Sequence, residues 1–165
     1  MIMSPDRSGS IPACSGVRVF PPAIYLGGLL IGFVVQFLWP VSFVTNGEPS
    51  LVRIAGGGLL FIGVIFIAAA AMAFRHAGTS PNPTRPTTAL TNVGPYRYSR
   101  NPMYVGLAVI QAAVALLANA VWPLVTLPFV LFIVKRFVID REERYLEAKF
   151  GADYRSYKST VRRWL

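Results

Sequence analysis

NPMYVGLAVIQAAVALLANAVWPLVTLPFVLFIV, residues 101–134, is the stretch that decides the fold, because it contains no Asp, Glu, Lys or Arg. A bilayer core of ~30 Å is crossed by about 20 helical residues, so these roughly 34 residues are too long for one span. They predict a helical hairpin whose turn lies near Asn119, Trp122 and Pro123. The second helix would continue past Lys135 and Arg136, whose long side chains can reach back to the membrane surface.

Two earlier stretches, 19–47 and 54–74, also lack charged residues and each suit one further span. The chain is 54% hydrophobic and 14% charged, which is apolar for a soluble domain. The sequence therefore predicts an all-α integral membrane protein with about four transmembrane helices. The expected segments are a loose N-terminal part at 1–19, one membrane domain at 20–165 with spans at about 20–44, 52–75, 102–118 and 121–140, a polar loop at 76–104, and amphipathic helices at 140–165.

The basic residues are distributed unevenly between the two sides of such a bundle. The formal net charge is +9, and four spans place every arginine and lysine except Arg53 on the side of the N-terminus, the loop 76–104 and the C-terminus. The positive-inside rule makes that side cytoplasmic. Because the cations flank membrane segments and form no separate basic stripe, nucleic acid is not an expected partner.

Few residues suit a metal or redox site. Cys14 is the only cysteine, which excludes an intramolecular disulfide and a cysteine-based metal site. His76, the only histidine, is expected to lie at a helix end near the membrane surface. The glycines at 27, 28, 32 and 56–58 match neither a phosphate loop nor a dinucleotide-binding pattern, so they indicate close helix packing.

The polar loop ends in GPYRYSRNPMY, residues 94–104, and the last span is followed by an acidic cluster that includes Glu142 and Glu143. Four spans bring both to one membrane surface, where mixed charges and aromatic rings suit a small zwitterionic or cationic ligand with an aromatic base. A simpler interpretation is that Arg100 pairs with Glu142 or Glu143 and fastens the loop to the last helix. Gly151 is expected to separate two helices beyond this cluster.

Two linked motifs resemble the isoprenylcysteine carboxyl methyltransferase family, especially its short bacterial members. They are L-x3-G-P-Y-x3-R-N-P-x-Y over residues 90–104 and E-E-x2-L-x3-F-G-x2-Y-x2-Y over residues 142–157. The resemblance covers about half of the chain, from residue 79 onward. It implies an enzyme of a bacterial inner membrane that binds S-adenosylmethionine in a cytoplasmic pocket without a Rossmann fold.

Carried over by position, the resemblance assigns residues to this pocket. The expected cofactor contacts are Thr88, Ala89, Leu90, Thr91, Tyr96, Asn101, Pro102, Met103, Tyr104 and Glu142, with Glu143 as an alternative. The expected catalytic residues are Arg100, Asn101, Tyr104 and Glu142. Many relatives have His at the position of Asn101, and Asn cannot titrate near neutrality. The arginine that eukaryotic members place near the substrate carboxylate aligns with Val138, so Arg136 or Arg141 would have to bind the substrate instead.

The resemblance implies methyl transfer to an amphiphilic acceptor that enters sideways from the bilayer. We expect O-methylation of a carboxylate, on an isoprenylcysteine-like or other lipid acid, because a carboxylate needs no base. An alternative is N-methylation of a phospholipid amine, for which the glutamates are the available bases. A nicotinamide-dependent sterol-type reductase is a third interpretation, although such enzymes have more spans, and a non-enzymatic membrane scaffold is a fourth.

Overall fold

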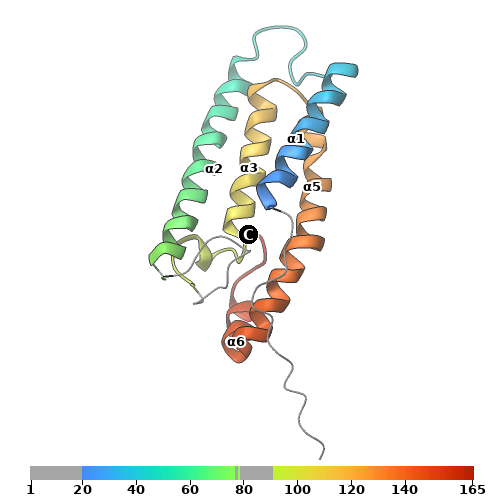
Figure 1. Ribbon diagram of the computed structural model, residues 1–165. Helices are drawn as coiled ribbons and strands as arrows, with labels where there is room; N and C mark the ends of the chain where they lie inside the picture. The colour runs from blue at the N-terminus through green and yellow to red at the C-terminus, as the bar shows by residue number, and fades with distance from the viewer. Residues whose placement is uncertain (1–19, 77, 79–90) are drawn as a thin grey trace, which may run out of the picture.

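A computed structural model describes residues 20–76, 78 and 91–165. Within these residues the named elements are all helices, which confirms the predicted all-α class. Figure 1 shows α1, α2, α3 and α5 side by side, with α6 across one end of the bundle. In chain order the elements are α1 (Pro21–Leu38), α2 (Ser50–His76), the 3₁₀-helix η1 (Gly94–Arg97), α3 (Pro102–Leu117), α4 (Trp122–Val125), α5 (Leu127–Val134), the π-helix η2 (Lys135–Ile139) and α6 (Asp140–Thr160).

Among the described residues, three continuous helical stretches are long and apolar enough to cross a membrane: Pro21–Leu38, Ser50–His76 and Trp122–Thr160. The apolar part of the last stretch ends at Ile139, and α6 beyond it is charged, so we place α6 outside the hydrocarbon. α3 is an apolar helix of 16 residues. Large apolar side chains face outward from the bundle, among them Phe37, Leu51 and Phe61. Such a surface is stable in contact with lipid, which agrees with the predicted integral membrane protein.

The predicted hairpin is present between α3 and α4. The chain reverses at Asn119, which has a positive φ of 49°. The Asn119 amide donates to the Val44 carbonyl at 3.0 Å and accepts from the Val44 N–H at 3.1 Å, so the turn is tied to the connection between α1 and α2. The predicted limit of the first span near Val44 is wrong, because α1 ends at Leu38. Pro40 lacks an N–H and disfavours a helical conformation at Trp39.

Some of the glycines pack helices together as predicted. A Cβ at Gly28 or Gly32 would collide with side chains or backbone of α5 and α4, and a Cβ at Gly56 would meet the α3 backbone at Ala113 and Leu117. Gly63, which the prediction did not include, packs against Gly106 and Ile110 of α3 in the same way. These contacts let the backbones approach closely, which is how helices associate in lipid. Glycines 27, 57 and 58 face open space in the structure, so for them the packing prediction is wrong.

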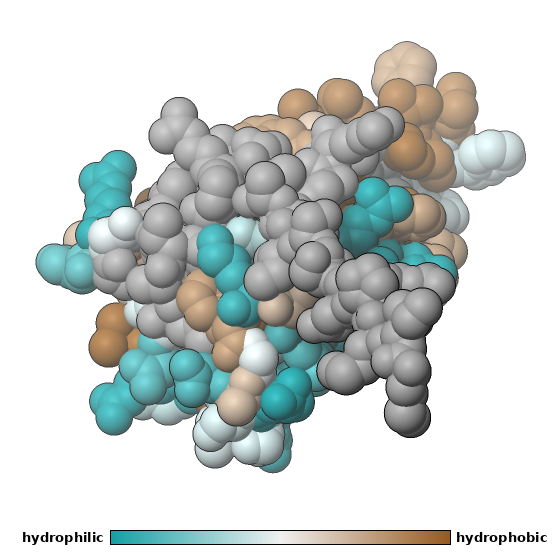
Figure 2. All heavy atoms as spheres, turned by 60° about the horizontal axis from the view of Figure 1, so that its bottom comes forward, coloured by the Kyte–Doolittle hydropathy of each residue, from teal (hydrophilic) through white to brown (hydrophobic). Residues whose placement is uncertain are grey.

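One end of the bundle carries a cluster of polar groups. α6 kinks at Gly151, whose φ of 53° and ψ of −117° interrupt the helix as the sequence predicted. Residues 161–165, which we call the return segment, run back to the start of α3, where the Arg100 N–H donates to the Arg162 carbonyl at 2.9 Å. Figure 2 views this end, and hydrophilic side chains gather along its rim. His76 lies at the end of α2 and is exposed, as expected.

Candidate functional site

The centre of the site is a hydrogen-bonded pair from two helices. The Tyr104 hydroxyl, in the first turn of α3, donates to Glu142 Oε1, in the first turn of α6, at 2.7 Å. The Tyr25 hydroxyl of α1 donates to the Tyr104 carbonyl at 2.9 Å and so fixes the start of α3 from the other side. Three elements that are distant in sequence therefore hold one carboxyl group at the polar end of the bundle.

Glu142 is placed where its charge is poorly solvated. Burial raises the pKa of Glu142 to about 7; the hydrogen bond from Tyr104 acts in the opposite direction, and the neighbouring charge of Glu143 adds to the rise. A carboxyl group that titrates near neutral pH can accept or release a proton under physiological conditions. Such perturbed groups are concentrated at functional sites.

Glu143, the next residue, has a different environment. It is 6% exposed, and the Arg163 guanidinium donates to both of its carboxylate oxygens, at 3.0 and 2.6 Å. Arg100 Nη1 lies 3.3 Å from Glu143 Oε1, and Arg163 Nη1 lies 3.3 Å from Asp140 Oδ1. The hydrogen bonds with Glu143 raise the pKa of Arg163. The simpler interpretation of Arg100, an ion pair that fastens the loop to the last helix, is therefore confirmed for Glu143, while Glu142 has no such partner among the described ion pairs.

Asn101 connects α3 to the return segment. Its side chain is buried, and Nδ2 donates to the Arg163 carbonyl at 2.9 Å, while its backbone N–H donates to the Ser99 hydroxyl at 3.1 Å. Pro102 follows as the first residue of α3 and is fully buried. In this structure both residues serve to position the start of α3 beneath the Tyr104–Glu142 pair.

Tyr96 lies on the other flank of this pair. Its ring packs edge-on against Phe74 of α2, with centroids 4.9 Å apart, and its carbonyl accepts from the Tyr157 hydroxyl at 2.8 Å. Burial raises the pKa of Tyr96, with smaller contributions from Tyr157 and the Glu142 charge. Met103 packs against the same cluster, which includes α2 residues. Tyr96 is thus brought towards Tyr104 and Glu142, whereas Met103 serves helix packing.

Other predicted site residues lie at the periphery. Thr91 borders a polar hollow of about 510 Å³ between the start of η1 and α6, which Arg97 and Asp153 also line. Arg136 and Arg141 are exposed on η2 and α6, and neither lines this hollow or the groove between α3 and α5. Thr88, Ala89 and Leu90 lie outside the described residues, as does Cys14.

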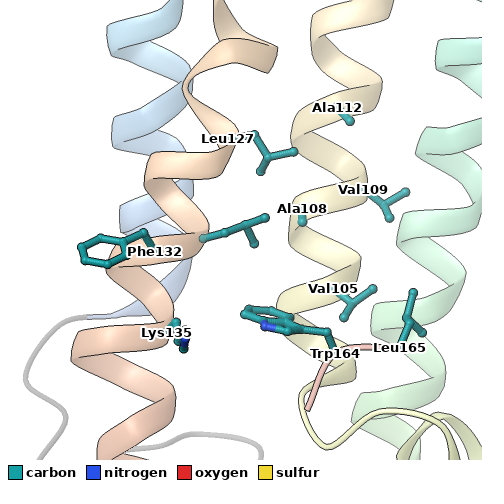
Figure 3. A pocket seen from close by; sticks show the side chains of 10 residues that line it. Val105, Ala108, Val109, Ala112, Leu127, Phe132, Lys135, Trp164 and Leu165 are labelled. Carbon is teal, nitrogen blue, oxygen red and sulfur yellow. The ribbon is translucent and has the colours of Figure 1, made fainter. Parts of the chain in front are cut away.

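The groove between α3 and α5 is apolar, has a volume of about 440 Å³ and runs along the bundle. Its walls come from Val105, Ala108, Val109 and Ala112 on α3 and from Leu127, Leu131 and Phe132 on α5, with Lys135, Trp164 and Leu165 completing the lining. Figure 3 shows Trp164 of the return segment reaching between the two helices, with Leu165 beside Val105 on the other side of α3. Along α3 the residues that line the groove begin with Val105, the residue after Tyr104.

Sequence reasoning did not identify Tyr25, Ser99 or Arg163 as parts of the site. Tyr25 is a single hydroxyl in an apolar span, which could have indicated a buried hydrogen bond. Arg163 is the cation that three clustered acids require, but the sequence does not show that the chain returns to them after the kink in α6.

Residues 51–153 match a family model described as phospholipid methyltransferase. The match runs from α2 to just beyond the kink of α6 and includes Tyr104 and Glu142, but not α1 or the return segment. An uncharacterized protein of Haemophilus influenzae is 48% identical over 64 residues, which are 38% of this chain and 100% of that protein. No solved structure matches the chain.

Proposed function

We propose, since the chain belongs to the phospholipid methyltransferase family, that it transfers a methyl group from S-adenosylmethionine to a polar group of a lipid-like acceptor in the membrane. The observation that carries this proposal is the Tyr104–Glu142 pair, a titratable carboxyl group at the polar end of a bundle in which α3, from Val105 onward, also lines an apolar groove. Such a site can bind one molecule by two features, a polar reacting group at the polar end and an apolar anchor in the groove.

The residues at this end fit the cofactor. Glu142 offers a carboxylate to its ammonium or ribose hydroxyls, and Tyr96 and Tyr104 offer aromatic rings beside it. Arg100 Nε is buried and has no hydrogen-bond partner among the described residues, so it can receive the cofactor's carboxylate. When bound, S-adenosylmethionine supplies a methyl group on a sulfonium, which is an electrophile that is already activated.

A phospholipid amine is the acceptor that Glu142 favours. At neutral pH an amine is largely protonated and must lose its proton before it can attack. A carboxylate with a pKa of about 7 can take that proton, and the hydrogen bond from Tyr104 holds it in place. The apolar groove keeps water away from the reacting groups. Binding holds the acceptor and the cofactor in position, so their translational and rotational entropy is lost on binding and not in the reaction step.

A lipid carboxylate is the second candidate, on the strength of the two sequence motifs. A carboxylate needs no base, and Lys135 lines the groove, so this cation can face an anionic group. Arg136 and Arg141, the residues expected from the resemblance to bind the carboxylate, would each have to turn inward from an exposed position. In either case we propose that the four apolar helices span the bacterial inner membrane and that the polar end is cytoplasmic, as the distribution of basic residues favours.

Calorimetric titration of the purified full-length chain with S-adenosylhomocysteine tests the cofactor proposal. We expect binding by the wild type, and at least tenfold weaker binding when Glu142→Ala removes a charge-assisted contact. Glu147→Ala, on the same helix but with a partly exposed carboxylate, is the matched control. Absence of binding by the intact protein would refute the proposal.

The acceptor is identified from the product. After incubation of the protein with labelled S-adenosylmethionine in lipid vesicles, a methyl ester is released by base whereas a methylated amine is retained. Base-stable label on a phosphatidylethanolamine vesicle supports the amine, and base-labile label supports the carboxylate. A non-enzymatic scaffold would give neither product, even if Glu142→Ala lowers its stability.

A further inference from the structure

Trp164 occupies a position that the proposed reaction leaves unexplained. It lies in the return segment, beyond the residues that match the family model, and it lines the groove between α3 and α5 at the level of Val105 and Lys135 (Figure 3). It is partly buried and packs against the core cluster that contains Val134 and Val138. The indole therefore forms a wall where the apolar groove meets the polar end.

The return segment holds Trp164 firmly. The two residues before it are fixed by hydrogen bonds, from the Arg100 N–H to the Arg162 carbonyl and from Asn101 Nδ2 to the Arg163 carbonyl, each at 2.9 Å. The Arg163 side chain is anchored by its two hydrogen bonds to Glu143. Asn101 holds the backbone of Arg163 and Glu143 holds its side chain, so both residues help to fix the position of Trp164 in the groove.

The groove suits the apolar chain of a membrane lipid. Its described lining is apolar except for Lys135, and the exposed rings of Phe129 and Phe132 show that the outer face of α5 is a lipid-facing surface. At that depth the molecules available to fill it are hydrocarbon chains. Lys135 at the polar end adds a positive charge that complements a phosphate or carboxylate of the same molecule.

We propose that Trp164 is a specificity-determining residue, which packs on the acceptor's apolar chain next to its polar group and so positions that group beside Tyr104. This inference rests on the proposed function and assigns the groove between α3 and α5 as the binding site of the acceptor's apolar chain. An indole suits this place because its ring packs on hydrocarbon while its N–H remains near the polar layer.

The test uses phosphatidylethanolamine that carries a photoreactive diazirine on its acyl chain, with the full-length chain in detergent, and maps the labelled peptides by mass spectrometry. In the wild type we expect label on the groove faces of α3 and α5 and on the return segment. Trp164→Ala should lower this label by about threefold, the scale of losing a handful of van der Waals contacts, and Trp164→Phe should restore most of it.

Ala112→Phe fills the groove without touching the return segment and should lower the label similarly. Ala68→Phe is the matched control, because Ala68 is exposed on α2, away from the groove lining. Equal groove labelling in the wild type, Trp164→Ala and Ala112→Phe, or label spread evenly over the outer faces of α1 and α2, would overturn the inference. Titration of the wild type with S-adenosylhomocysteine separates the two proposals. If the protein does not bind this compound, the proposed function is refuted. If the groove labelling still depends on Trp164 in that protein, the assignment of the groove is supported.

Discussion

Replacing Glu142 by Gln should make the protein more stable above neutral pH and leave it unchanged in acid. Folding raises the pKa of Glu142 from 4.5 to about 7, so the folded state binds this proton more tightly than the unfolded state. Stability from this group is fully present below the unfolded value and is lost as the pH rises towards 7. This difference in pKa between the unfolded and folded states corresponds to roughly 3 kcal/mol of stability, since one pKa unit is about 1.4 kcal/mol.

Glutamine cannot ionise and can still accept the hydrogen bond from Tyr104. Between about pH 4 and pH 8 the stability of Glu142→Gln relative to wild type should therefore rise by roughly 3 kcal/mol, or by about 6 °C or more in the unfolding midpoint of a chain of this length. Thermal unfolding of both proteins in one detergent, across that pH range, measures this difference in stability.

Glu147→Gln is the control for this measurement. It makes the same chemical change on the same helix at a carboxylate that is 37% exposed and paired with Lys158, so its effect should be nearly independent of pH. A Glu142→Gln curve that runs parallel to wild type from acid to alkaline pH, or that diverges in acid instead, would show that the carboxyl group is not desolvated by the fold.

Two further substitutions test the surroundings of the site. Arg163→Ala leaves the buried Glu143 without the two hydrogen bonds from Arg163 and should lower the unfolding free energy by about 2 kcal/mol, the scale of hydrogen bonds to a charged group. Arg162→Ala, whose side chain is exposed, should have little effect, and equal losses in the two variants would contradict the ion-pair argument. Gly63→Val forces a side chain into α3 and should lower stability by about 1–3 kcal/mol, while Gly57→Val points into open space and should be tolerated, with the unfolding midpoint as the measurement for both.

The helical elements were largely predictable because lipid imposes one rule on the whole chain. Every buried backbone group in hydrocarbon must be bonded within its own helix, so a charge-free run of sufficient length specifies a helix. The limits of the helices depend on local chemistry that such a rule ignores. Pro40 ended α1 before the apolar run did, and Asn119 ended α3 within a run that contains no charge.

The site was predictable only in part, because its parts meet through tertiary contacts. The motifs indicated Tyr104 and Glu142 as members of one pocket, and the structure joins them by a hydrogen bond. They did not indicate the partner of Glu143, since Arg163 reaches it only after α6 kinks at Gly151. They also could not indicate that Asn101 bonds a backbone carbonyl, because a motif gives residue identity and not the atoms that face it.

The division of labour between the two adjacent glutamates follows from these contacts. Consecutive residues on a helix point about 100° apart, so Glu142 and Glu143 face different neighbours even though their backbones are similar. Arg163 and Arg100 neutralise Glu143, and this keeps a second full negative charge from acting on Glu142. Without Arg163 the charge of Glu143 would be less compensated and would raise the pKa of Glu142 further, because like charges disfavour ionisation. The return segment thus acts on both halves of the proposed reaction: through Arg163 it keeps Glu142 able to ionise near neutral pH, and through Trp164 it borders the groove proposed for the acceptor.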